Sequence, residues 1–453
     1  MPTDKKRNDL LTQPIKSTLT KMTIPMMMGM VALMSFNLVD TFFIGLIGTD
    51  ELAAVSFTFP ITFTLISLTI GLGVGTSAVI AKTLGSGQED KAQIQGCSAL
   101  ILSTVLVIGL AVLGYLTIDP LFILLGSEAN TLNHIHDYMQ IWYLGAVFLT
   151  LPMIGNAILR ASGDTKTPGI IMALGGFINA VLDPILIFGW GPVPAMGIQG
   201  AAFASVAAWI VSSSLIIYLL TVQRGLVELA IPAFDKLKLS VIAILKIGLP
   251  ASGASMLTPL AMSILTAIIA QYGHEAVAAF GVGQRIESIA SMLVLALSMT
   301  LPPFISQNLG ANQTKRVQQA YKMSCRFVLF WQLGVYVLLA VCAPWIADAF
   351  SDNEKVQHLI CIFIWILPVG YGLQGIVILT NSSFNALHQP MISVQLSILR
   401  LFVFYVPFAY IGGLVGGIVG LFAACVIANL LMASVSFMRF NHYFKQIQIT
   451  SKA

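Results

Sequence analysis

Apolar runs long enough to cross a bilayer recur along almost the whole chain, and this feature limits the possible folds more than any other. Each run is bounded by charged residues, glycine or proline. Only 9% of the residues are charged, whereas a soluble domain carries about 25%. The sequence therefore predicts an all-α membrane protein with about twelve transmembrane helices. The expected spans are residues 22–48, 52–81, 95–118, 135–160, 168–189, 198–221, 241–272, 276–308, 321–346, 356–384, 390–413 and 416–438.

The lysines and arginines are distributed unevenly between the two sides of these spans. With a cytoplasmic N-terminus, twenty of the 23 fall in inside loops and tails or at the cytoplasmic ends of spans, Lys355 falls outside, and Arg285 and Arg400 fall well within spans. This bias satisfies the positive-inside rule. We therefore expect a multi-pass protein of a bacterial or archaeal plasma or inner membrane, with both termini cytoplasmic. The positive charge sets topology and does not indicate a nucleic-acid partner.

The chain also repeats itself at an offset near 225 residues. Ile24-Pro25 recurs as Leu249-Pro250, and Leu84-Gly85 recurs as Leu309-Gly310. Because six helices return the chain to its starting side, the two halves run in the same direction and form two parallel six-helix repeats. We expect an N-lobe at residues 1–221 that holds a cation or proton site, a cytoplasmic linker at 222–239, and a C-lobe at 240–453.

Two carboxylates, Asp40 and Asp183, stand inside predicted spans. Acids at membrane depth are costly and by default mark proton or ion pathways. At the repeat offset, Asp40 corresponds to Leu265 and Asp183 to Tyr405 or Val406. The acids thus belong to the first half only, which favours a chemical task over a symmetric structural need. The alternative is a buried polar pair with a structural role.

An asparagine precedes each of these acids by about one helical turn. Asn37 lies three residues before Asp40 and Asn179 four before Asp183, and both spacings place the pair on one helix face. Pro184 has no N–H, so we expect a kink at the level of Asp183. We hypothesise that the two acids form one protonation site in which both asparagines take part.

Three further charged residues lie at membrane depth in the second half. Arg285 and Glu287 belong to the eighth span and Arg400 to the eleventh. Because Arg285 and Glu287 are two residues apart, they face different directions on a helix and need not pair. We regard the three as a second candidate charged site. A structural ion pair, or an arginine reaching toward the membrane surface, is the alternative reading.

Methionines crowd several spans near these charges. Flexible thioethers suit surfaces that accept ligands of many shapes, although such residues in apolar helices more often serve packing. We therefore expect a substrate cavity in which methionines take part. The candidates are Met30, Met34, Met256 and Met292.

No motif in the sequence indicates catalysis, a cofactor or a metal site. The five cysteines stand singly without CxxC spacing. His134 and His136 have no third ligand nearby in the sequence. Walker, Ser/His/Asp and HExxH patterns are missing, and we find no paired set typical of an intramembrane enzyme. We therefore expect a protein that is not an enzyme and draws on an ion gradient, with protons or, alternatively, sodium as the coupling ion.

A Gly-Asp-Thr-Lys-Thr-Pro loop at residues 163–168 is followed by an Asn-x-x-x-Asp-Pro pattern at residues 179–184. Together with the first-span acid and the parallel repeats, these motifs resemble the multidrug and toxic compound extrusion (MATE) transporters over nearly the whole chain. Acids confined to the first half look like the prokaryotic DinF-type branch. The resemblance implies a V-shaped pair of lobes that alternates between outward-open and inward-open states. It places Asp40, Asn179 and Asp183 in the N-lobe cation network.

The resemblance also implies a function. We expect a secondary active exporter that exchanges protons for cationic or amphipathic drugs and dyes, acting as a monomer in the lipid bilayer. The sodium-coupled branch carries further acids in the C-lobe, whereas residues 251–271 and 362–381 contain none, which favours protons. A sodium-coupled drug antiporter and a flippase for lipids or lipid-linked oligosaccharides are the alternatives.

Overall fold

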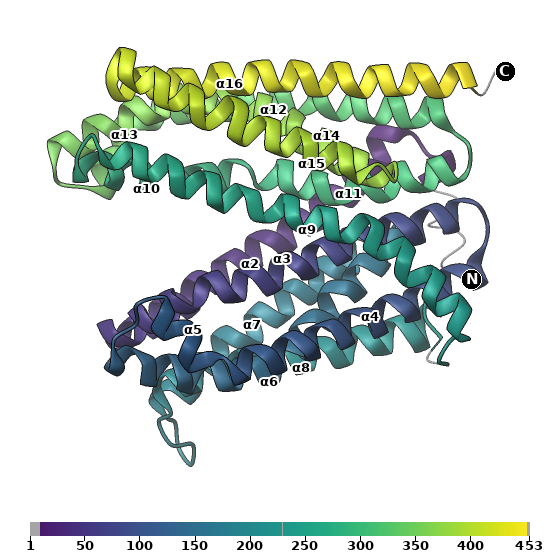
Figure 1. Cartoon of the computed structure of the whole chain (residues 1–453), viewed down its shortest axis with the longest axis horizontal. Coiled ribbons are helices and arrows are strands. Elements are labelled where there is room, and N and C mark those ends of the chain that lie inside the picture. The colour runs from purple at the N-terminus through teal and green to yellow at the C-terminus, as the bar shows by residue number, and fades with distance from the viewer. Residues whose placement is uncertain (1–9, 229, 451–453) are drawn as a thin grey trace. The chain divides into compact units, whose positions relative to one another are not determined.

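The computed structural model describes residues 10–228 and 230–450, and these residues are almost entirely helical (Figure 1). Eleven helical stretches in this part of the chain are long and apolar enough to cross a membrane. The last stretch, Pro390–Gln446, has 57 residues and bends where Gly416 and Gly417 leave helical dihedral angles. A straight helix of that length would measure about 85 Å, against a hydrocarbon core of about 30 Å. The stretch therefore makes two passes, and the fold has the twelve transmembrane helices that the sequence predicts.

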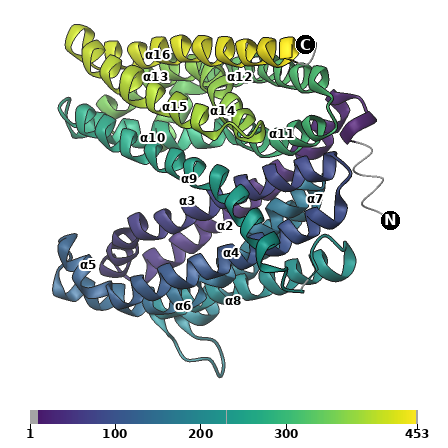
Figure 2. The ribbon, with the colours of Figure 1, turned by 45° about the vertical axis from the view of Figure 1, so that its right-hand side comes forward.

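The chain forms two compact units, Met1–Ser252 and Gly253–Ala453. In the first unit α4, α6 and α8 lie side by side (Figure 2). The helices of this unit are α2 (Ile15–Ile47), α3 (Thr49–Gly85), α4 (Glu89–Leu116), α5 (Ile118–Leu124), α6 (Ala129–Ala161), α7 (Lys166–Phe188), α8 (Gly197–Tyr218) and the beginning of α9 (Phe234–Ala270).

The second unit contains the rest of α9 and the remaining spans. The eighth span consists of two helices, and the tenth and eleventh spans are interrupted by a 3-10 turn, Leu367–Gly370, and a π-helical turn, Leu399–Tyr405. Its helices are α10 (His274–Ala290), α11 (Met292–Gly310), α12 (Thr314–Phe350), α13 (Glu354–Ile366), α14 (Tyr371–Ala386), α15 (Pro390–Ile398) and α16 (Val406–Thr450).

Each unit buries a hydrophobic core of its own. In the second unit the Phe363 ring packs edge-on against Phe422, with centroids 5.4 Å apart, and against Phe280 at 6.1 Å. In the first unit Trp142 packs edge-on against Trp209 with centroids 6.0 Å apart. A hydrophobic core of its own is what each of two domains in one chain has.

The non-helical segment between the halves is shorter than the linker expected at residues 222–239. A π-helical turn continues α8 to Gln223, and α9 begins at Phe234. The first half of α9 packs on α3, since the Ser252 hydroxyl donates to the Leu68 carbonyl at 3.1 Å. A Cβ on Gly75 would lie 2.5 Å from the Ile244 carbonyl oxygen. The first half of α9 thus belongs to the first compact unit, because small residues of α3 let the two backbones approach closely.

Candidate functional site

Asp40 of α2 and Asp183 of α7 lie within hydrogen-bonding reach of each other. Asp183 is fully buried and Asp40 is partly buried. One oxygen of each group, Asp40 Oδ1 and Asp183 Oδ2, is buried without a hydrogen-bond donor among the described residues. Two ionised carboxylates offer no donor to each other. A proton held between them can supply the missing donor, so the arrangement is suited to binding a proton.

The packing of α2 on α7 brings these acids together. On one side of the pair, Gly29 faces Gly169 so closely that a Cβ on Gly29 would lie 2.5 Å from the Gly169 Cα. On the other side, the Phe43 and Phe188 rings meet edge-on with centroids 6.2 Å apart. Close backbone approach at small residues is the usual way in which transmembrane helices associate. The acids lie between these two contacts along both helices.

Asn179 connects the pair to a third helix. Its side-chain amide donates to Asp183 Oδ1 at 3.2 Å and to the hydroxyl oxygen of Ser205 in α8 at 3.3 Å. The contact with Asp183 is the one that the four-residue spacing predicts. Ser205 was not predicted from the sequence, because a lone serine in an apolar span carries no local signal of its partner.

Asn37 lies differently from Asn179. Its side chain is exposed, and its backbone carbonyl accepts a hydrogen bond from the Thr41 hydroxyl at 2.9 Å. Among residues 10–228 and 230–450, the structure records no side-chain bond from Asn37 to Asp40. Its participation in the site stays a prediction. Spacing on one helix places Asn37 near Asp40 but does not determine whether its side chain is buried.

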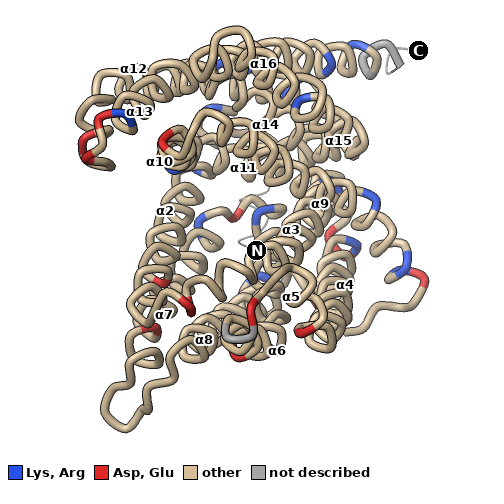
Figure 3. The backbone as a smooth tube through the Cα atoms, turned by 60° about the vertical axis from the view of Figure 1, so that its left-hand side comes forward, with Lys and Arg blue, Asp and Glu red and all other residues tan. Residues whose placement is uncertain are grey.

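Tyr138 of α6 lies close enough to Asp40 and Asp183 to interact electrostatically with both. It was not predicted as a site residue, because aromatic residues near the end of a span usually mark the membrane interface. Side chains of α6 and α8 thus lie near the pair carried by α2 and α7: Tyr138 interacts with the acids electrostatically, and Ser205 bonds to Asn179. Figure 3 shows how sparse charged positions are along the helices.

The second unit contains a smaller polar cluster around Glu287. Glu287 Oε1 accepts a hydrogen bond from the Gln374 side chain at 2.9 Å, and the positive charge of Arg400 acts on Glu287. The Arg400 guanidinium also lies 6.0 Å from the centre of the Tyr405 ring. Arg285 is exposed on α10, and no contact between it and this cluster is recorded in the described part of the chain. Two of the three predicted charges, Glu287 and Arg400, therefore lie close enough to interact electrostatically, and Gln374, which was not predicted, bonds to Glu287.

The four methionines predicted to line a substrate cavity are all partly buried. Met30 and Met34 belong to the first unit, and Met256 and Met292 to the second. Their role at a substrate site stays a prediction. In the described residues, no group of three or more His, Cys, Asp or Glu side chains could hold a metal ion.

The sequence matches the MatE family model twice, at residues 25–185 and 250–411. The second match begins 225 residues after the first, which is the offset at which the sequence repeats. The two halves are therefore copies of the same unit, and together the matches span most of the chain.

Curated proteins and solved structures agree with this match. The FAD transporter of Shewanella oneidensis is 42% identical over 428 residues, covering 94% of this chain and 95% of that protein. Multidrug export protein MepA of Staphylococcus aureus is 24% identical and covers 93% of this chain and 92% of its own. The MATE transporter VcmN of Vibrio cholerae, in its bent form, superimposes with a TM-score of 0.91 at 32% identity over 98% of both chains. The chain therefore belongs to the MATE family of membrane transporters.

Proposed function

We propose that this transporter is a proton-coupled secondary exporter in which Asp40 and Asp183 bind the coupling proton. The observation that carries the proposal is the placement of the two carboxyl groups within hydrogen-bonding reach, each with a buried oxygen that lacks a donor. One shared proton removes a negative charge and satisfies both oxygens. Without this proton, the two carboxylates repel each other in a medium of low dielectric constant.

The energy of the proton gradient is sufficient for export. One proton moving across 100 mV supplies about 2.3 kcal/mol, which supports a gradient of roughly fifty-fold in a neutral solute. No nucleotide, cofactor or catalytic step is needed for this task. We therefore propose transport rather than enzymatic activity.

In the proposed cycle, proton and substrate exclude each other. Protonation changes the hydrogen bonds that Asp183 makes with Asp40 and Asn179, and hence the packing of α2 on α7. Substrate binding favours the form in which both acids are charged, and protonation favours the form in which the pair holds a proton. The lobes alternate between outward-open and inward-open forms. Protons that enter from outside would then release the substrate outside.

We propose cationic or amphipathic drugs and dyes as the substrates. Support comes from relatives named as multidrug export proteins and from methionines in the spans near Asp40, whose thioethers adapt to ligands of different shape. The positive-inside bias supports a plasma or inner membrane location with cytoplasmic termini, although residues 1–9 and 451–453 lie outside the described residues. We expect the exporter to act as a monomer.

A second candidate substrate is FAD. The relative with 42% identity over 94% of this chain is an FAD transporter, whereas the multidrug relative MepA reaches 24%. FAD carries large planar rings, like many dyes, but adds a negatively charged diphosphate. The charge of the transported substrate therefore separates the two candidates experimentally.

The test is collapse of a pH gradient in inside-out vesicles without sodium, after addition of ethidium, a fluoroquinolone or FAD. We expect at least one of these substrates to make protons leave vesicles that contain the wild-type protein. Asp40→Asn and Asp183→Asn should not respond, whereas Asp50→Asn, which changes an exposed acid at the start of α3, should behave as wild type.

Each other outcome changes the conclusion. A response in Asp183→Asn equal to wild type would remove the acid pair from the mechanism. A response that appears only after sodium is added would make sodium the coupling ion. Transport of FAD without transport of the cationic dyes would establish the flavin as substrate. If no substrate collapses the pH gradient, with or without sodium, a lipid flippase would be favoured.

A further inference from the structure

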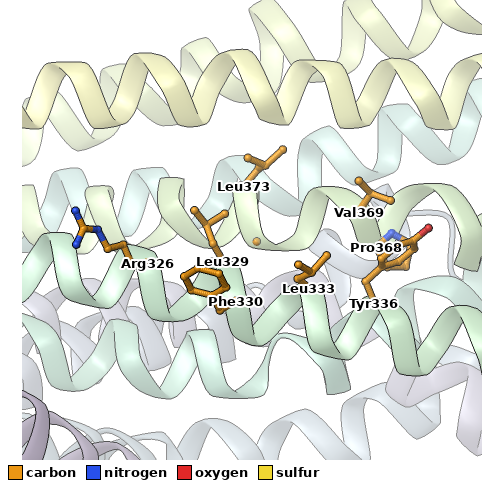
Figure 4. Close-up of a pocket in the computed structure, with 9 residues that line it drawn as sticks. Arg326, Leu329, Phe330, Leu333, Tyr336, Pro368, Val369 and Leu373 are labelled. Carbon is orange, nitrogen blue, oxygen red and sulfur yellow. The ribbon is translucent and has the colours of Figure 1, made fainter.

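A groove of about 680 Å³ lies on the second unit between α12 and the segment 368–373, which joins the 3-10 turn to α14 (Figure 4). Apart from an arginine and the hydroxyl of a tyrosine, the side chains along it are apolar. That hydroxyl, of Tyr336, donates to the Trp365 carbonyl at 3.2 Å. The wall from α12 consists of Arg326, Leu329, Phe330, Leu333 and Tyr336.

The dimensions of the groove match one leaflet of a bilayer. From Arg326 to Tyr336 the helix advances about 15 Å, which is half of a hydrocarbon core of about 30 Å. The side chain of Phe330 is 75% exposed and that of Leu333 is 57% exposed. In a transmembrane helix such exposed apolar side chains face lipid, so an acyl chain has direct access to the groove.

Basic residues continue the groove at the end of α12 nearer Thr314. Lys315, Lys322 and Arg326 are spaced by seven and four residues, which places them on one face of the helix. Lys315 and Arg326 are exposed and Lys322 is partly exposed. The first acid of α12 is Asp348, near its other end, and α14 carries none. A negative group at this end would therefore meet only positive charge on these two helices.

We infer that this groove binds an anionic phospholipid. Its phosphate would contact Arg326 and Lys322, and one acyl chain would lie along Leu329, Phe330 and Leu333. Basic pockets between transmembrane helices on the cytoplasmic side suit anionic head groups, and the positive-inside rule assigns this end of α12 to that side. A free phosphate or nucleotide would leave the apolar wall unused. The inference concerns a site apart from Asp40 and Asp183 and does not depend on the coupling ion.

The experiment is native mass spectrometry of delipidated full-length protein, titrated with phosphatidylglycerol or phosphatidylcholine of the same acyl chains. Wild type should bind phosphatidylglycerol more tightly. Removing both charges with Lys322→Gln and Arg326→Gln should weaken that binding by about fivefold for each charge, with little effect on phosphatidylcholine. Arg439→Gln, which removes an exposed arginine from α16, should leave the preference unchanged.

Two further measurements separate the parts of the site. Leu333→Trp, which fills the groove, should weaken both lipids alike and keep the preference for the anionic one. Inorganic phosphate at millimolar concentration should not displace phosphatidylglycerol. Equal binding of both lipids by wild type, an equal loss in Arg439→Gln, or displacement by free phosphate would each overturn the inference. A thermal melt of every variant establishes that the loss concerns binding and not folding.

Discussion

Arg224 donates from Nη2 to Asp164 Oδ2 at 2.7 Å, which joins the segment between the two repeats to the loop that carries the Gly-Asp-Thr-Lys-Thr-Pro motif. The Thr167 hydroxyl donates to the same oxygen at 2.9 Å, and the Thr167 backbone N–H donates to the other oxygen at 3.2 Å. The Asp164 side chain is 3% exposed and that of Arg224 is 20% exposed. One buried carboxylate thus holds together the start of α7 and the end of the first repeat.

Breaking this ion pair should destabilise the first unit. Arg224→Gln leaves a buried carboxylate without its cation, which costs about 3 kcal/mol in such settings. We expect a lower melting temperature in detergent, and a smaller loss for Arg224→Gln combined with Asp164→Asn than the two single losses added together. Lys236→Gln, which changes an exposed lysine of α9, should be neutral. Strictly additive losses would show that the two groups do not stabilise each other.

The contact between Gly29 and Gly169 predicts a strong effect of one methyl group. A Cβ on Gly29 would lie 2.5 Å from the Gly169 Cα, so Gly29→Ala must push α2 away from α7. We expect a loss of about 1–3 kcal/mol in stability and impaired proton coupling, because the two acids separate. Gly45→Ala in the same helix meets nothing within 4 Å and should be neutral or slightly stabilising. Thermal melts and transport assays of both variants check this difference, and equal effects would contradict it.

Asn179 should matter more than Ser205. A hydrogen bond to a charged group contributes about 1.5–3 kcal/mol, so Asn179→Ala should reduce substrate-driven proton release by about tenfold or more. Ser205→Ala removes only the second acceptor of the Asn179 amide and should have a smaller effect. Initial rates of proton release in vesicles, normalised to the amount of protein, measure both. A larger loss in Ser205→Ala would show that the bond to α8, and not the bond to Asp183, is the essential one.

Substrate affinity should depend on pH through the acid pair. If one proton competes with substrate, lowering the pH weakens substrate binding by up to tenfold per pH unit, since each ligand must affect the other equally. The variant with both Asp40→Asn and Asp183→Asn should bind substrate with an affinity that does not change with pH. Fluorescence titration of a dye at several pH values tests this. A constant wild-type affinity would rule out competition at this site.

The cluster around Glu287 predicts an asymmetry between two substitutions. Arg400→Gln removes the positive charge that acts on the partly buried Glu287 carboxylate, whereas Glu287→Gln keeps an oxygen that can accept the hydrogen bond from Gln374. We therefore expect Arg400→Gln to lower the melting temperature more than Glu287→Gln does, and the double variant to recover part of the loss. If Glu287→Gln proves the more harmful of the two, its carboxylate has a task beyond pairing with Arg400.

Several features were predictable from the sequence because they depend on local or summed properties. The number of spans follows from apolar length, and the twofold repeat from recurring motifs. The hydrogen bond from Asn179 to Asp183 follows from helical spacing, since residues four apart share a helix face whatever surrounds them. The family resemblance rested on short motifs of the same kind, and the double match to the family model agrees with it.

Only the tertiary structure decided which helices meet and which faces they turn to one another. Several contacts of the candidate sites join separate helices. These are the approach of Asp40 to Asp183, the positions of Ser205 and Tyr138 near that pair, and the bond from Gln374 to Glu287. The packing of the first half of α9 on α3 also joins separate helices. Spacing within one helix could not reveal that Asn37 and Arg285 lie on exposed faces. The physical reason is that helix pairing depends on the fit of whole surfaces, here set by close contacts such as Gly29 on Gly169, and no single segment contains that information.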